Sequence, residues 1–253
     1  MKLSGWSRPG WGLGVGSGER VRRVWRELTG AASAFRTAGW VVDSAPGGGP
    51  GERRRIGVVR LEDAGAVSAP AELVAAVREV VAASVVDLTD PGAVVELLGP
   101  LVPVADVRGP AVLAYADPGC FKPRRGSGVA TLAAGDAAVV GLAAACGAED
   151  ADESSITEMT SPLSVVRANG QVVAASGYEV WCGELAHIGV LTHPRFRGRG
   201  LGAAVASATV AHALAAGLVA QWRARATIVA SRRIAWTLGF IEVGRQLSVL
   251  LQR

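Results

Sequence analysis

The chain has 253 residues, of which 50% are hydrophobic and 19% are charged, so it can bury a large core and lacks the composition of a disordered protein. Its 33 glycines show no Gly-X-Y period, which excludes a collagen-like chain. The net charge is +4, and arginine supplies nearly all of the positive charge because Lys2 and Lys122 are the only lysines.

The cysteines and the apolar segments limit the location of the protein. Cys120, Cys146 and Cys182 are widely spaced and form no Cys-x-x-Cys pair, which predicts neither a disulfide framework nor a metal site and indicates a reducing, cytoplasmic location. The first residues contain no apolar signal segment. Residues 201–220 carry no formal charge, but their alanines and the four-residue spacing of the larger apolar side chains favour a helix packed on a sheet over a membrane span.

The first half of the chain is divided into two segments. Residues 1–52 predict a flexible arm that contains one amphipathic helix near 19–35; its alternating glycines lack the preceding strand and the lysine of a phosphate loop. Residues 53–124 predict a small α/β domain without a catalytic constellation. Its expected strands are 56–61 and 111–116, and its expected helices are 71–83 and 93–98.

The third segment, residues 125–253, predicts the order β-α-βββ-α-β-α-β, which is a mixed α+β domain. Asn169-Gly170 predicts a tight hairpin, and Asp136 predicts a helix start. Residues 149–158 predict an acidic loop. The expected strands are 129–132, 163–167, 171–181, 184–192, 223–228 and 241–251, and the expected helices are 136–146, 201–220 and 231–238.

A loop rich in glycine and arginine, residues 193–202, joins a strand to the long alanine-rich helix. Its glycines allow close approach of a ligand to the backbone, and the unpaired N–H groups at the start of the helix can surround a pyrophosphate. The pattern is neither the dinucleotide-binding one, because a meander strand precedes it, nor a Walker loop, because it lacks the lysine. The glycines are Gly198, Gly200 and Gly202, and Arg195, Arg197 and Arg199 add positive charge.

This loop resembles the signature of the GNAT superfamily, the acetyl-CoA-dependent N-acetyltransferases. The family pattern Arg/Gln-x-x-Gly-x-Gly/Ala is matched by Arg195, Gly198 and Gly200, and again two residues later. The family's Leu-Gly-Phe ending is present as residues 238–240. The resemblance covers about residues 125–253 and implies a mostly antiparallel sheet flanked by helices, here with an N-terminal α/β extension.

The resemblance also implies where acetyl-CoA binds. In the family, the strand before the loop separates from its neighbour and pairs with the pantetheine arm, which implies Ile188, Val190, Leu191 and Thr192 along the arm. The N–H of Val190 would polarise the thioester carbonyl. The amides that would hold the pyrophosphate are those of Arg197, Gly198, Arg199, Gly200, Leu201 and Gly202.

The catalytic residues follow from the same resemblance. An alkylamine is neutral only about once in 10³ molecules at pH 7, so a base helps, and Glu184 stands where many family members place one. His187 and Glu179 are the alternative bases, and Tyr178 is a candidate for the acceptor pocket. The family's tyrosine acid is replaced by Ala235 and a frequent asparagine by Ile228, which leaves Ser231 as the group near the thiol.

The predicted function is transfer of an acetyl group from acetyl-CoA to a primary amine of a small molecule or peptide, by direct attack in a ternary complex. Nucleic acid and membrane are not expected partners, and a homodimer is left open. The alternative is a non-catalytic acyl-CoA-binding module in which the 53–120 segment regulates or dimerises. A third interpretation makes the N-terminal half a degenerate acetyltransferase repeat. The acidic loop 149–158 either attracts a cationic amine or is solvated.

Overall fold

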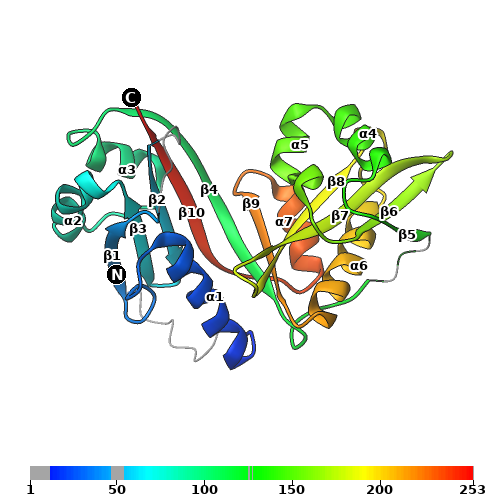
Figure 1. Ribbon diagram of the computed structural model, residues 1–253, viewed down its shortest axis with the longest axis horizontal. Helices are drawn as coiled ribbons and strands as arrows, with labels where there is room; N and C mark the ends of the chain where they lie inside the picture. The colour runs from blue at the N-terminus through cyan, green and yellow to red at the C-terminus, as the bar shows by residue number, and fades with distance from the viewer. Residues whose placement is uncertain (1–11, 47–53, 125, 127, 253) are drawn as a thin grey trace, which may run out of the picture.

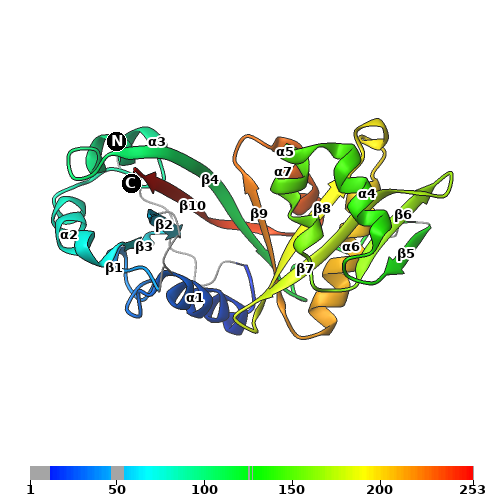
Figure 2. The same cartoon turned by 45° about the horizontal axis from the view of Figure 1, so that its top comes forward.

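The computed structural model describes residues 12–46, 54–124, 126 and 128–252. Within these ranges the strands form one ten-stranded sheet with helices on both faces (Figures 1 and 2). The helices are α1 (Val15–Thr29), α2 (Val74–Ala82), α3 (Pro91–Leu98), α4 (Ala137–Cys146), α5 (Ala148–Ser154), α6 (Leu201–Ala215) and α7 (Val229–Thr237), with short helices η1 (Ala71–Leu73), η2 (Ile156–Glu158) and η3 (Pro194–Phe196). The strands are β1 (Gly39–Ser44), β2 (Arg55–Leu61), β3 (Ala64–Ala69), β4 (Val104–Ala116), β5 (Val129–Leu132), β6 (Leu163–Ala168), β7 (Gln171–Trp181), β8 (Leu185–Thr192), β9 (Val219–Arg225) and β10 (Ile241–Leu251).

The sheet is continuous through the described residues. Its strand order is β1-β3-β2-β10-β4-β9-β8-β7-β6-β5, and neighbours are antiparallel except in the pairs β1–β3 and β8–β9. This mixed, mostly antiparallel architecture confirms the predicted fold class. The last strand, β10, lies between β2 and β4 and joins the two halves of the chain (Figure 1). Strands from both segments belong to this one sheet, so the sheet itself does not divide the chain near residue 124. The division into segments 53–124 and 125–253 stays a prediction about folding units.

Two layers of helices cover opposite faces of the sheet. Alternate residues of β8 point to one layer or the other. Leu185 and Leu191 pack with α1 and α4 on one face, while Ala186 and Ile188 pack with α6 and α7 on the other. The helices α2 and α3 cover the β2 and β10 region through Leu247 and its neighbours. The layers α1–α4–α5 and α2–α3–α6–α7 therefore lie on opposite faces.

The predicted amphipathic helix of the N-terminal segment is α1, but this segment is not a detached arm. Val21, Val24 and Trp25 are buried at helical spacing, and the indole Nε1 of Trp25 donates to the Tyr115 hydroxyl at 2.6 Å. The strand that follows, β1, adds an edge to the sheet. The interpretation as a flexible arm is wrong for the described part, because the helix supplies a face of the core. The remainder of the predicted arm, residues 1–11 and 47–52, lies outside the described residues.

The structure contains the elements expected in residues 53–124. It also contains one strand, β3, that the sequence analysis did not predict. The carboxylate of Asp90 accepts from the N–H of Ala93 at 2.8 Å and begins α3, which starts two residues before the expected helix 93–98. Strand β4 is longer than predicted, and the expected helix over 71–83 is η1 followed by α2. Strand β3 has all six residues buried, so its sequence lacks the alternation that identifies a half-exposed strand.

The hairpin and helix starts of the third segment are confirmed. Asn169 and Gly170 have φ values of 50° and 80°, which are the values of a tight hairpin between β6 and β7. The carboxylate of Asp136 accepts from the N–H of Ala138 at 2.8 Å at the start of α4.

Three boundaries in this segment are corrected. The acidic residues 149–158 form α5 and η2 rather than a loop, because Ala and Glu favour a helix. Helix α6 ends at Ala215, since Gly217 takes φ 77° and turns the chain into β9, which begins earlier than predicted.

Among the described residues, no helix is both long and apolar enough to cross a membrane.

Candidate functional site

The strands β8 and β9 separate along their length, which opens the sheet at one place. Their parallel pairing covers only Leu185–His187 against Val219–Gln221, and from Ile188 onward β8 has no register partner on β9 (Figure 1). On its other edge, β8 stays paired with β7 along its whole length. The part of β8 predicted to lie along the pantetheine arm is therefore the part that faces the opening.

The direction of the β8 amides follows from the pairing with β7. The N–H of His193 donates to the carbonyl oxygen of Val173 at 2.9 Å, on the β7 side. Because successive N–H groups of a strand point to opposite edges, those of Ile188, Val190 and Thr192 point to the opening. These three residues also share the α6–α7 face, whereas the side chain of Leu191 packs in the core under α4.

The loop between β8 and α6 ends in a helix start that no side chain caps. Gly198 and Gly200 both have φ 76°, and a Cβ at either position would meet nothing within 4 Å, so open space surrounds the loop backbone. A Cβ on Gly202 would lie 3.0 Å from Thr192 Oγ1, so α6 begins in close contact with the end of β8. The free amides of this helix start have the geometry and partial charge that bind anions.

Two arginines of this loop are held by the protein itself. Arg197 donates from Nε to the carbonyl oxygen of Thr192 at 3.1 Å and forms an ion pair with Asp150 of α5. The guanidinium of Arg199 lies 5.1 Å from the centre of the Phe196 ring and donates to the carbonyl of Arg195. These contacts hold the side chains of Arg197 and Arg199 against the loop and α5.

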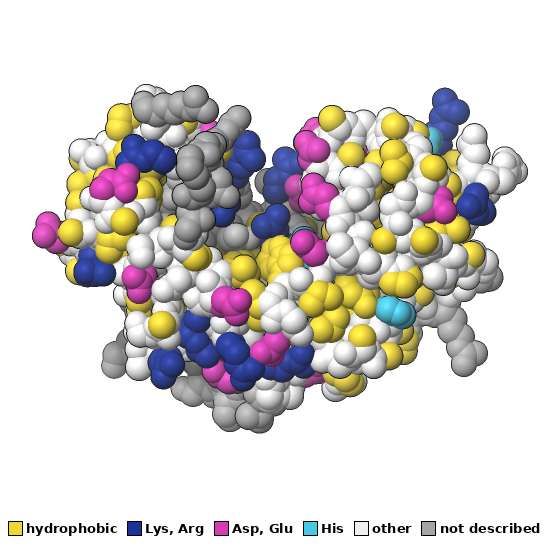
Figure 3. All heavy atoms as spheres, in the orientation of Figure 1, with side chains coloured by type: hydrophobic (Ala, Val, Ile, Leu, Met, Phe, Trp, Pro, Cys, Tyr) yellow, Lys and Arg dark blue, Asp and Glu magenta, His cyan; other side chains and the backbone are white. Residues whose placement is uncertain are grey.

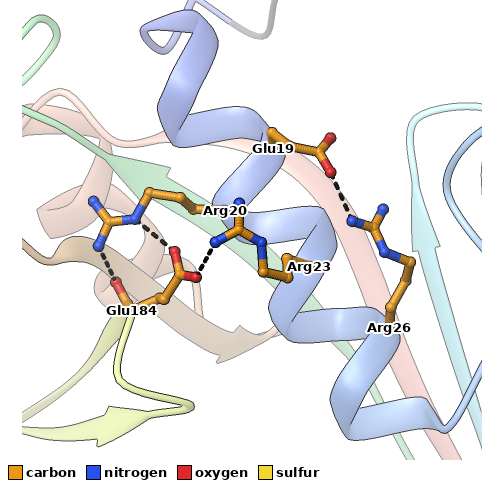
Figure 4. Close-up of polar contacts among 5 residues, drawn as sticks. All are labelled: Glu19, Arg20, Arg23, Arg26 and Glu184. Atoms are coloured by element: carbon orange, nitrogen blue, oxygen red, sulfur yellow. Dashed lines mark hydrogen bonds and ion pairs between the residues drawn. The ribbon is translucent and has the colours of Figure 1, made fainter. Parts of the chain in front are cut away.

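The predicted base, Glu184, lies in a double ion pair (Figure 4). Arg20 Nε donates to Glu184 Oε2 at 2.7 Å, and Arg23 bonds the other carboxylate oxygen. Desolvation raises the pKa of Glu184, but the hydrogen bonds and charges of the two arginines outweigh it and hold this pKa below its ordinary value. A carboxylate stabilised in this way is a poor proton acceptor, so the geometry counts against a catalytic role. Through these two ion pairs, Glu184 holds α1 against the start of β8.

Replacing Glu184 by glutamine tests this interpretation. We expect the variant to be about 1 kcal/mol less stable than the native protein at pH 7, because both arginines lose their partner and are partly exposed. Since the folded-state pKa is lowered, the stabilisation is present above the ordinary value of 4.5 and fades as the pH falls through the folded-state pKa. Urea unfolding at pH 7 and at acid pH measures this change.

The same variant separates a structural from a catalytic Glu184. Loss of a general base costs about 10²–10⁴ in rate, whereas loss of this ion pair leaves acetyl transfer within a few-fold of the native rate. Glu72→Gln, which removes an exposed ion pair with Arg54, is the control and should change neither property. A drop of 100-fold in turnover for Glu184→Gln alone would restore the catalytic interpretation.

Ser231 lies in the first turn of α7, where its hydroxyl accepts from Trp222 Nε1 at 3.0 Å. It does not cap the helix, since Ile228 occupies the capping position without a side-chain bond. Ala235, which stands where the family has its tyrosine acid, is buried in the core between the sheet and α7.

The alternative bases are also engaged in the structure. His187 is 8% exposed and stacks on Trp181 at 4.5 Å between ring centres, and burial lowers its pKa to about 3. Glu179 accepts from Trp181 Nε1 at 3.0 Å. Burial raises the pKa of Tyr178, whose hydroxyl lies 3.0 Å from His212 Nδ1. Among the described residues, no group of three His, Cys, Asp or Glu side chains could hold a metal ion.

Two polar residues of β9 were not identified from the sequence. Gln221 is fully buried beside His187, and Arg223 follows it on the same face of the sheet. The sequence analysis expected this strand at 223–228, whereas β9 spans 219–225. With the correct bounds, two-residue alternation would have placed Gln221 and Arg223 on one face of the strand. The acidic residues of α5 are largely paired, with Glu149 and Glu153 on Arg225.

Comparison with known proteins connects this geometry to a family. Residues 164–246 match the family model described as GNAT acetyltransferase. No curated protein matches the chain.

Solved structures give partial matches. A putative acetyltransferase from the GNAT family of Novosphingobium aromaticivorans is 26% identical with a TM-score of 0.49, and the match covers 59% of this chain and 66% of that one. A GCN5-related N-acetyltransferase from Kribbella flavida is 20% identical (TM-score 0.46; 64% and 65%), so the chain spans slightly under two thirds of both. A GCN5-related N-acetyltransferase-like protein from Streptococcus suis is 18% identical (TM-score 0.48; 92% and 99%). In its C-terminal part, over residues 164–246, the chain is similar to the GNAT acetyltransferase family.

Proposed function

We propose that the protein transfers an acetyl group from acetyl-CoA to a primary amine by direct attack in a ternary complex. The observation that supports this most is the alignment of two features: the opening between β8 and β9 leads directly to the uncapped start of α6. A long ligand with a peptide-like arm and a diphosphate needs such a pair of sites in sequence.

The residues present fit acetyl-CoA. The amides of Ile188, Val190 and Thr192 offer donors along the opening, and open space surrounds Gly198 and Gly200 beside the helix start. When bound, acetyl-CoA supplies an activated acetyl group as a thioester.

The protein's own part in the reaction is binding and polarisation. The N–H of Val190 donates to the thioester carbonyl oxygen, which favours attack by the neutral amine and is worth about 10²–10³ in rate. A bond forms between the amine nitrogen and the acetyl carbon, the carbon–sulfur bond breaks, and the proton lost by nitrogen ends on the thiolate. Glu184 and Ala235 supply neither base nor acid, so the amine must arrive as the free base.

One second candidate has a specific observation in its favour. The ion pair on Glu184 and the buried Ala235 also suit a non-catalytic acyl-CoA-binding module. Calorimetry with acetyl-CoA followed by thiol release over a panel of amines separates the two. Binding with turnover supports the transferase, binding without turnover on any amine supports the module, and absence of binding contradicts both.

A further inference from the structure

Trp222 lies on β9 at the point where β8 and β9 begin to separate. Its neighbour Gln221 is the last residue of β9 that has a register partner on β8. The side chain of Trp222 lies on the face of the sheet that carries α6 and α7, where it is 3% exposed. There it packs edge to face on Phe240, with 5.4 Å between the ring centres. The indole is therefore held in a fixed position at one edge of the opening.

The indole N–H of Trp222 determines how the Ser231 hydroxyl can be used. Trp222 Nε1 lies 3.0 Å from Ser231 Oγ. An indole can only donate, so the serine oxygen is the acceptor and the hydroxyl hydrogen points away from Trp222. Within the part of the chain that the structure describes, this hydrogen has no protein acceptor. Ser231 is partly exposed, so a ligand can supply one.

The contacts of α7 place this hydroxyl at the opening. Ser231 and Ile234 are three residues apart on the helix and therefore share one face. A Cβ added to Gly202, in the first turn of α6, would lie 3.2 Å from Ile234 Cδ1 and 3.0 Å from Thr192 Oγ1. This face of α7 thus meets the start of α6 and the end of β8. Ser231 is bounded by Trp222 on the β9 side and by these residues on the β8 side.

The two faces of the sheet separate the two reactants. On the face that carries α1 and α5, the molecule is hollowed between its two halves (Figure 3), and an amine can approach the opening from this side. Ser231 lies on the other face, where the uncapped start of α6 offers its amides to acetyl-CoA. The hydroxyl is therefore placed beside the acyl donor, and the group on which it can act is the sulfur of the thioester.

A hydrogen bond from this hydroxyl suits the charge that develops in acetyl transfer. As the carbon–sulfur bond breaks, its electron pair stays on sulfur, and an O–H donor stabilises the growing negative charge. The bond that Ser231 accepts from Trp222 polarises the hydroxyl and strengthens it as a donor. Serine keeps its own proton, so the proton lost by the amine still ends on the thiolate.

We propose that Ser231 donates a hydrogen bond to the sulfur of acetyl-CoA as the carbon–sulfur bond breaks, and that Trp222 positions the hydroxyl for this bond. The inference rests on the proposed acetyl transfer at the β8–β9 opening and adds the group that stabilises the leaving thiolate. Ser231 is then a catalytic residue, and Trp222 is a positioning residue that acts through it.

Variants of the two residues test the proposal by thiol release from acetyl-CoA with ethylamine, benzylamine and glycinamide as acceptors. Ser231→Ala should lower kcat and kcat/KM by about tenfold each, because a bond made only to the developing charge is lost. Trp222→Phe should lower kcat by about threefold, since the hydroxyl remains but is no longer oriented. Ser231→Thr keeps the hydroxyl and should retain most of the native kcat. The double variant Ser231→Ala with Trp222→Phe should lose no more than Ser231→Ala alone.

Trp25→Phe is the matched control for Trp222→Phe. Trp25 is 2% exposed, and its Nε1 donates to the Tyr115 hydroxyl at 2.6 Å on the opposite face of the sheet. Both changes remove one buried indole hydrogen bond, so they should cost similar stability in urea unfolding. Only Trp222→Phe should lower kcat. An equal fall of kcat in the two variants would overturn the role of Trp222, because lost packing would then explain the effect.

The thiol of bound coenzyme A gives a measurement that needs no amine. A hydrogen bond from Ser231 stabilises the thiolate, so the pKa of the bound thiol should be about one pH unit higher in Ser231→Ala than in the native protein. The ultraviolet absorbance of the thiolate, followed against pH, measures this pKa.

The two measurements separate this inference from the proposed transfer. An unchanged kcat or an unchanged thiol pKa in Ser231→Ala overturns the role of Ser231, even where the native protein acetylates an amine. If no amine reacts, a raised thiol pKa in Ser231→Ala supports the hydrogen bond although acetyl transfer fails. Absence of coenzyme A binding contradicts both proposals.

Discussion

Replacing Gly200 by valine is expected to weaken binding of acetyl-CoA by about 100-fold, which corresponds to about 2.8 kcal/mol. Gly200 precedes α6 at φ 76°, a conformation that a β-branched residue adopts only with strain. Relief of that strain turns the first amides of α6 away from the loop, and losing two charge-assisted hydrogen bonds of about 1.5 kcal/mol each accounts for the effect. Isothermal titration with acetyl-CoA measures it.

The control is at the other end of the same helix. Gly217 has φ 77° and, as at Gly200, a Cβ added there would meet nothing within 4 Å, so Gly217→Val carries the same backbone strain. We expect both variants to lose similar stability in urea unfolding, but only Gly200→Val to lose acetyl-CoA affinity. Equal affinities in the two variants would mean that the start of α6 does not hold the ligand.

Gly239→Ala is expected to destabilise the protein by more than about 3 kcal/mol. Gly239 has φ 87°, and a Cβ there would lie far inside 3.0 Å of the carbonyl oxygen of Cys120, which is backbone and cannot turn aside. The neighbouring chain is fixed by the bond from Lys122 N–H to the Leu238 carbonyl at 2.8 Å. The left-handed conformation costs about 1–2 kcal/mol, and relief of the clash moves the end of α7 and adds the remainder.

Gly135 provides the comparison for this clash. It has φ 74° with nothing within 4 Å, so Gly135→Ala should lose only the 1–2 kcal/mol of the backbone conformation. Urea unfolding of both variants measures the difference. Similar losses would show that the approach of residues 120–122 to Gly239 does not constrain the protein. A larger loss at Gly239 would explain physically why a glycine stands in the Leu-Gly-Phe sequence.

The parts of the fold that depend on local chemistry were predictable from the sequence. Asp90 and Asp136 begin helices through bonds to amides two or three residues away, and Asn169-Gly170 turns a hairpin by its own backbone preference. The glycine pattern near Gly200 is also local, so the position of the loop between β8 and α6 was predictable.

The parts that depend on distant residues were not. Glu184 pairs with Arg20 and Arg23, which lie more than 160 positions earlier, and nothing near Glu184 in the sequence indicates this contact. Strand β3 is buried along its whole length and therefore shows no alternation. The pairing of Gln221 with His187 needs β9 to lie beside β8, a long-range arrangement that single-sequence periodicity does not contain.

The position of β10 has a consequence for synthesis on the ribosome. Strands β2 and β4 each leave one long edge open until residues 241–251 have emerged to fill the gap between them. Until then the N-terminal half presents unpaired backbone that can pair with other nascent chains. Emergence of β10 from the ribosome, rather than completion of the first hundred residues, is therefore the step that protects these two strand edges from aggregation.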